Sequence, residues 1–225
     1  GKQYFLKAHD QFVATVMLDP KGKYTRDAAF AQMLAMKNAL EYDETGGKSK
    51  ACKTNSEGVC TYKEEKKKKT KKDKDSKVDA ASEYPESDYT TDEKKMLEAY
   101  DLYTKYVSDK EDEELPKIMY HRAKLAMEHN RFGDARPLIE EILAKFDGSV
   151  YAAWCSEMLL DLLTIRWVDK NNNPSEVVKA SEDLETWSKK LQEMKVWKHP
   201  EADEIREAVP RLLAGIGWKK GSAQR

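Results

Sequence analysis

The chain has 225 residues, which is enough for one or two compact domains. Hydrophobic residues make up 40% of it and charged residues 36%, a balance that favours a surface-rich helical protein over an enzyme with a deep core. Its 40 basic and 41 acidic residues nearly cancel, but nine lysines gather between Lys63 and Asp79, so a basic tract is set in an acidic body. No window approaches the roughly 18 apolar residues of a membrane span, and no signal peptide is visible.

One pattern of apolar and alanine residues occurs four times. An apolar residue is followed after three positions by Ala, after four more by a large apolar residue, and after three more usually by another apolar residue. These offsets put all four positions on one stripe of a helix, where the small Ala lets a neighbouring helix approach closely. The copies are Phe5-Ala8-Phe12-Thr15, Met96-Ala99-Tyr103-Tyr106, Phe132-Ala135-Ile139-Ile142 and Val177-Ala180-Leu184-Trp187.

A second amphipathic segment precedes every copy except the first. These segments cover residues 26–42, 115–129 and 150–167, so the repeating unit is predicted to be helix A, a turn and helix B. Because the first copy has no helix A before it, we expect the array to continue upstream. After His199-Pro200 the helical pattern resumes, with Pro210 expected to bend the last helix.

The units resemble the tetratricopeptide repeat (TPR) family. Copies two and three are 36 residues apart, near the family's unit of about 34. Residues 130–135 (NRFGDA) look like that family's turn into helix B, and Pro20, twelve residues after Ala8, falls where the family's closing proline does. Departures from the family pattern are Met119, Arg122 and Asp147-Gly148. The resemblance implies one all-α domain, an antiparallel helix-pair solenoid, over residues 1–225, with helical repeats at 1–42 and 91–217.

Residues 43–90 interrupt the second unit between its helices A and B. This insertion is rich in Lys, Ser, Thr and Asp and has almost no apolar content, so most of it is predicted to be flexible. Its run from Lys66 to Lys72 (KKKKTKK) could bind nucleic acid or anionic lipid. We favour a solvated, charge-mixed loop instead, since no aromatic residues that could stack on bases are interleaved with the lysines.

Two cysteines, Cys52 and Cys60, lie within the insertion. Their spacing allows a disulfide, which would place the protein in an oxidising compartment such as a periplasm. The alternatives are two free thiols in a cytosolic protein or half of a metal site, although no nearby His or further Cys completes four ligands. Cys155, in a predicted helix A, is expected to be a buried small apolar residue.

No catalytic motif stands out, and we predict neither a cofactor nor a bound metal ion. The four histidines form no HExxH arrangement, and neither a phosphate-binding glycine loop nor a GxSxG elbow occurs. Acidic residues at 109–114 are expected to form a solvated linker, and the five tryptophans are expected to pack between helices. We therefore predict a protein that is not an enzyme.

In TPR proteins, helix A side chains line a concave groove where partner peptides lie. Placing the third unit on that register implies a partner-binding groove whose surface combines an aromatic ring, a thioether and positive charge. That surface suits an extended or helical peptide with acidic character, unless the same face packs on a neighbouring domain. The implied groove residues are Lys117, Tyr120, Lys124, Met127 and Glu128.

The leading functional hypothesis is a non-catalytic protein–protein interaction scaffold. The segment from Asp19 to Tyr42 is loosely similar to large envelope-associated TPR proteins of deltaproteobacteria, including those of gliding-motility machinery. This resemblance implies a periplasmic or outer-membrane-associated assembly component, with a cytoplasmic location as the alternative. Two other hypotheses are an outer-membrane assembly or Tol-Pal-type coordinator, and a regulatory domain that binds an anionic polymer or lipid through the lysine-rich loop.

Overall fold

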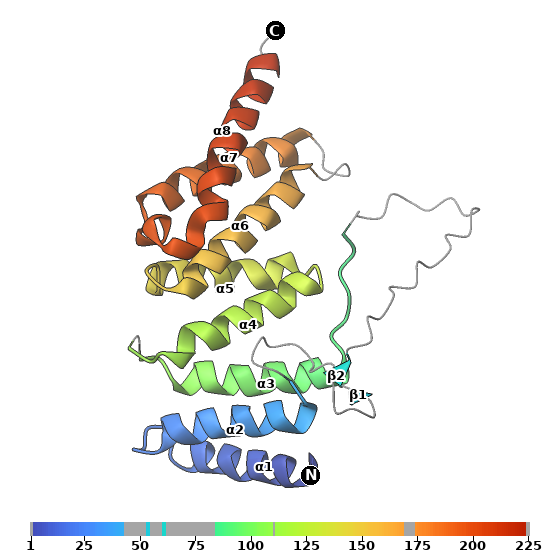
Figure 1. Cartoon of the computed structure of the whole chain (residues 1–225), viewed down its shortest axis with the longest axis vertical. Coiled ribbons are helices and arrows are strands. Elements are labelled where there is room, and N and C mark those ends of the chain that lie inside the picture. Colours follow the sequence, from blue (N-terminus) through green and yellow to red (C-terminus); the bar gives the residue numbers. More distant parts are fainter. Residues whose placement is uncertain are drawn as a thin grey trace, which may run out of the picture.

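The computed structural model is an extended stack of α-helices (Figure 1). It describes residues 2–42, 53–54, 60–61, 84–109, 111–168 and 174–223. The helices follow one another along the long axis, so that α1 lies at one end and α8 at the other. Within the described residues the elements are α1 (Lys2–Leu18), α2 (Thr25–Leu40), β1 (Lys53–Thr54), β2 (Cys60–Thr61), α3 (Thr91–Tyr106), α4 (Glu114–Glu128), α5 (Phe132–Lys145), α6 (Val150–Val168), α7 (Pro174–Glu193), two short 3₁₀ turns (Lys195–Lys198 and Pro200–Ala202) and α8 (Asp203–Ala223).

The predicted helix-and-turn order is confirmed. Each of the four repeat copies lies on one helix, namely α1, α3, α5 and α7, and each predicted helix A segment coincides with α2, α4 or α6. Every helix packs against the next one along the chain, and α4 also packs against α6, two helices further on. The protein is therefore an all-α chain whose helices pack in sequential pairs.

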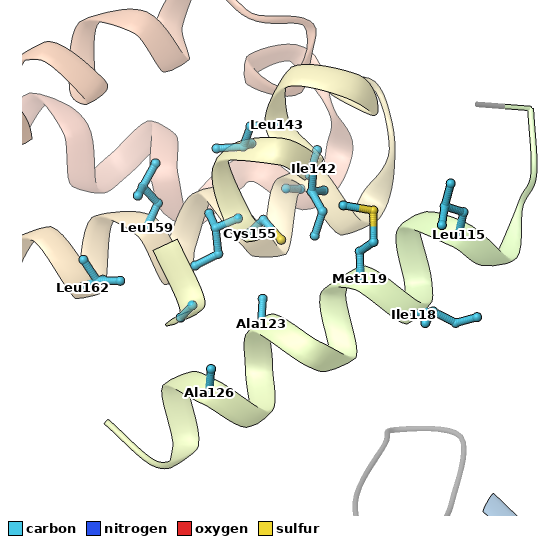
Figure 2. Close-up of a cluster of buried hydrophobic side chains, with 14 of the residues drawn as sticks. Leu115, Ile118, Met119, Ala123, Ala126, Ile142, Leu143, Cys155, Leu159 and Leu162 are labelled. Atoms are coloured by element: carbon cyan, nitrogen blue, oxygen red, sulfur yellow. The ribbon is translucent and has the colours of Figure 1, made fainter. Parts of the chain in front are cut away.

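The core consists of the repeat stripes and the helix faces that cover them. Met119 points from α4 toward Ile142 of α5, with Ala123 and Ala126 on the same side of α4 (Figure 2). Ala123 is fully buried and Ala126 is 2% exposed, so their small size lets α4 and α5 approach closely. Cys155 is a buried free thiol in this core, as expected from its position beside apolar residues, and burial raises its pKa.

Asp112 joins three helices at the start of α4. One carboxylate oxygen accepts hydrogen bonds from the Tyr103 hydroxyl at 2.8 Å and from two backbone N–H groups of the first turn of α4, at Glu114 and Leu115. The other accepts from Arg26 Nε of α2 at 2.7 Å. The expectation of a solvated linker at 109–114 is therefore wrong for Asp112, whose side chain is 5% exposed because these donors surround it.

Residues 84–90 lie against the turn between α4 and α5. Tyr84 packs edge-on against Phe132, Ser87 N–H donates to the His129 carbonyl at 3.0 Å, and Asn130 Nδ2 donates to the Pro85 carbonyl at 2.9 Å. A capping box between Thr90 and Glu93 then starts α3, which explains why the helix begins at Thr91. This end of the insertion is thus held on the next helix pair.

Several predictions about the insertion fall outside the described residues. They are its flexibility over 43–83, the role of its lysine run, and the Cys52–Cys60 disulfide, since Cys52 and the side chain of Cys60 are not described. The strand pairing was not predicted from the sequence: β1 and β2 are antiparallel, with Lys53 opposite Thr61 and Thr54 opposite Cys60.

The last helix, α8, runs further than expected. It continues through Pro210 and past Gly215 and Gly217 to Ala223, beyond the predicted boundary at 217. A proline inside a helix removes one backbone hydrogen bond without necessarily ending it, and buried Val209 and Ile216 hold this helix against its neighbours on both sides of Pro210. Within the described residues, no helix has the length and apolar character needed to cross a bilayer.

Candidate functional site

An open groove lies between α4 and α6, the first helices of two neighbouring pairs. Its volume is about 450 Å³. The lining positions recur at helical spacing, so each helix contributes one face, whose Tyr120, Tyr151 and Met158 also pack against the apolar core. We call this the aromatic groove; it is lined by Lys117, Tyr120, His121 and Lys124 of α4 and by Tyr151, Trp154, Glu157 and Met158 of α6.

Three aromatic rings form the floor of the groove. The Tyr120 ring lies 5.3 Å from Trp154 and 5.8 Å from Tyr151, measured between ring centroids, and Tyr151 meets Trp154 edge-on at 5.5 Å. All three side chains are half-buried, with the rest of each ring open to solvent. The rings therefore hold one another in place and still offer apolar surface to a ligand.

The tyrosine hydroxyls of the groove are neutral at physiological pH. Burial, together with the nearby Cys155, raises the pKa of Tyr120 to about 12. Burial also raises the pKa of Tyr151, although Lys117 acts in the opposite direction. Each hydroxyl thus remains a hydrogen-bond donor to a bound group.

Charge is distributed unevenly along the groove. Lys117 and Lys124 line it on α4, where they pair with Glu114 at 3.6 Å and Glu128 at 4.0 Å. On α6, burial and repulsion from neighbouring acidic residues, first Glu204, raise the pKa of Glu157. The two lysines of α4 are thus ion-paired along their own helix, and α6 adds the carboxyl group of Glu157 to the lining.

A smaller cavity of about 170 Å³ extends the same surface toward α2. It shares Lys117 and His121 with the aromatic groove and adds Leu34 and Lys37 of α2. His121 lies between the two, stacked on Tyr100 with an angle of 18° between the ring planes. The two cavities together form a surface over α2, α4 and α6, all of which are helix A segments of the repeat.

Three of the five groove residues implied by the family register lie together. Lys117, Tyr120 and Lys124 all line the aromatic groove. Met127 packs against the core without lining the groove, and Glu128 is exposed at the last turn of α4, where it pairs with Lys124. The structure places these two residues on the last turn of α4, beyond the positions that line the groove, so the register is wrong for them.

The contribution of α6 was not predicted from the sequence. Tyr151 and Trp154 line the groove, although the tryptophan was expected to pack between helices. Among the others with described side chains, Trp167 and Trp187 are buried and Trp197 packs on the core. The missing signal was the spacing of Tyr151, Trp154 and Met158, which puts all three on one face of the same helix.

No family model, curated protein sequence or solved structure matches this chain. The chain itself defines an all-α stack of sequential helix pairs, with an aromatic groove across the first helices of two of them.

Proposed function

We propose that this protein is a non-catalytic, TPR-like interaction scaffold that binds a peptide segment of another protein in the aromatic groove. The observation that carries the proposal is the half-buried triad of Tyr120, Tyr151 and Trp154 between two helix A segments. Clustered, partly exposed aromatic rings are typical of the centres of protein interfaces.

The stacking of the helices supports the solenoid part of the proposal. Helix A packs on helix A where α4 meets α6. Helix B is joined to helix B where Arg136 of α5 pairs with Asp183 of α7. Stacking of like helices is the arrangement expected when each repeat contacts its neighbours in a solenoid.

The chemistry of the groove favours a peptide with an apolar anchor next to acidic residues. The rings accept a large apolar or aromatic side chain, and Lys117 and Lys124 lie on the same helix as Tyr120, one turn to either side. A carboxylate next to the anchor could share these lysines with Glu114 and Glu128, whereas Glu157 on the α6 side disfavours it.

The test is selection from a random-sequence peptide library displayed on phage, with the whole chain as bait. Recovered peptides are expected to pair a large apolar residue with an acidic one. Trp154→Ala should weaken their binding at least about tenfold in fluorescence anisotropy, since it removes the largest ring of the triad. Lys124→Glu should weaken the binding of the acidic peptides, and the remaining binding should depend less on salt concentration.

Tyr120→Ala, which removes another ring of the triad, should weaken binding as Trp154→Ala does, and Tyr24→Ala is its matched control. Tyr24 is 65% exposed just before α2, far along the chain from the groove, so its loss should leave peptide binding unchanged. Selected peptides that bind Tyr120→Ala and Trp154→Ala as well as the parent chain would show that the groove is not the binding site.

We also propose that the protein is a component of a bacterial cell-envelope assembly. This proposal rests on the loose resemblance of residues 19–42 to envelope-associated TPR proteins and on the spacing of Cys52 and Cys60. Mass spectrometry of protein kept under non-reducing conditions is expected to show one disulfide between these cysteines. Two thiols open to alkylation in that sample would remove the argument for an oxidising compartment.

A further inference from the structure

The cavity between α2 and α4 has the lining of a pocket for one apolar side chain. Its buried lining includes Met33, Tyr100 and Ile118, none of which is more than 4% exposed. Leu34 lines it from α2 and is 36% exposed; among the described residues beyond position 24, only Leu34 and Val178 are large apolar side chains with at least this exposure. At about 170 Å³ the cavity is smaller than the roughly 300 Å³ at which pockets for whole ligands begin, so it fits a single side chain.

This cavity and the aromatic groove are equivalent sites in successive helix pairs. The helix before each site contributes four residues at the same spacing, and these are Phe30, Met33, Leu34 and Lys37 of α2 for the cavity and Lys117, Tyr120, His121 and Lys124 of α4 for the groove. Because α4 lies between the two sites, it lines both of them, and Lys117 and His121 belong to both linings. A partner that fills one site therefore has the other directly beside it.

The separation of the two sites follows from helix geometry. The α4 residues that line the cavity each precede one that lines the groove by three positions, which is about 4.5 Å along the helix. Packed neighbouring helices lie about 8–10 Å apart, and one site lies on each side of α4. The centres of the two sites are therefore about 9–11 Å apart.

A peptide that fills both sites must present two side chains on one face at that separation. In a polyproline II helix every third residue returns to the same face, and at about 3.1 Å per residue positions i and i+3 are about 9.3 Å apart. In a β-strand every second residue returns to the same face, which gives about 6.8 or 13.6 Å. In an α-helix positions i and i+7 are about 10.5 Å apart. The separation thus fits a polyproline II helix or an α-helix and excludes a β-strand.

Hydrogen-bond donors in the aromatic groove favour the polyproline II helix. The side chains of Tyr120, Tyr151 and Trp154 line the groove, and within the described part of the chain neither tyrosine hydroxyl nor the indole N–H has an acceptor. An α-helix uses its backbone carbonyls in its own hydrogen bonds, whereas a polyproline II helix leaves them free to accept from such donors. Aromatic-lined grooves also suit the rings of proline-rich segments.

We infer that the partner segment crosses α4 as a polyproline II helix and fills both sites with residues three positions apart. A large aromatic or apolar residue occupies the aromatic groove, an aliphatic residue occupies the cavity, and the residues between them pass over Lys117 and His121. Proline at the two intervening positions sets this conformation before binding and so lowers its entropic cost. This binding mode rests on the proposed peptide binding and adds the conformation and the residue spacing of the partner.

Fluorescence anisotropy with short uncharged peptides tests the spacing on the whole chain. The probes carry identical Gly-Ser ends around Trp-Pro-Leu, Trp-Pro-Pro-Leu or Trp-Pro-Pro-Pro-Leu, and each is made in both chain directions. The two-proline probe, in one of its directions, is expected to bind at least about tenfold more tightly than the other two. Glycine in place of its prolines should weaken binding, because a glycine-rich peptide is a flexible coil.

Leu34→Asp tests whether the second side chain occupies the cavity. It should lower the affinity of the two-proline probe to that of the same probe with Ala in place of Leu, and remove the preference for two prolines. Trp154→Ala should weaken every probe. Leu18→Asp is the matched control, since Leu18 is 86% exposed at the end of α1 and lines neither site. Circular dichroism should show unchanged helix content in both Asp variants.

The outcomes separate this binding mode from the peptide binding itself. Binding that depends on Trp154 but is equal for all three proline spacings overturns the polyproline II mode alone. So does tighter binding of a helix-forming alanine peptide with Trp and Leu seven positions apart, or a two-proline probe that Leu34→Asp leaves unchanged. Probes that fail to bind overturn the mode alone if the library-selected peptides bind in a Trp154-dependent way. If those peptides also fail, the proposed function falls with it.

Discussion

The Asp112 carboxylate accepts hydrogen bonds from three helices, α2, α3 and α4. Asp112→Ala leaves the buried Tyr103 hydroxyl and the first backbone N–H groups of α4 without their acceptor, and Arg26 keeps its ion pair with Asp27. We expect a loss of about 2–4 kcal/mol in the free energy of unfolding, measured by urea denaturation. Asp109→Ala is the control, since Asp109 is exposed in the same loop and should cost little.

The same carboxylate should make stability depend on pH. Burial would raise the pKa of Asp112, but the hydrogen bonds from Arg26 and Tyr103 outweigh it and hold the pKa below its usual value. Its contribution is therefore complete above the ordinary Asp pKa of about 3.9 and is lost as pH falls through the lower folded value. The stability difference between the parent and Asp112→Ala should accordingly shrink in acid, and a constant difference from neutral pH to about pH 2 would contradict this account.

At the scale of elements, the start of α3 combines a local cap with a tertiary anchor. Thr90 and Glu93 form the capping box, and His129 of the α4–α5 turn lies 3.3 Å from the Glu93 carboxylate. Thr90→Ala is expected to lower the free energy of unfolding by about 1 kcal/mol. Thr186→Ala, in the exposed middle of α7, is the comparison: its hydroxyl only bonds back to the Glu182 carbonyl, so its loss should be nearly neutral.

The helices could be predicted from the sequence because their apolar residues recur at helical spacing. The stripe of Phe132, Ala135 and Ile139 is one example, since it appears directly in the residue types. The docking of residues 84–90 and the role of Asp112 have no such period, because both depend on contacts between segments far apart in the chain. The family register likewise predicted three of the groove residues, Lys117, Tyr120 and Lys124. It did not predict Trp154, which lines the groove because α6 packs on α4.

At the scale of the whole molecule, the helices stack in sequence, so each helix is stabilised by its neighbours and not by the entire chain. Arg136 tests this, because it donates from α5 to both carboxylate oxygens of Asp183 on α7, at 3.0 Å for Nη2 with Oδ1, and to Glu140 at 2.6 Å. Arg136→Met removes the ionic link between these two helices and leaves Asp183 without its guanidinium.

We expect Arg136→Met to lower the free energy of local opening in α5–α8 by about 1–3 kcal/mol, which speeds amide hydrogen exchange there. Amide exchange in α1–α3 should not change. Exchange followed by mass spectrometry resolves the two regions. Arg211→Met is the control, since Arg211 is 75% exposed and pairs with Glu207 of the same helix. Faster exchange of equal size in α1–α3 would mean that the stack unfolds as one cooperative unit, and the nearest-neighbour description of this fold would then be wrong.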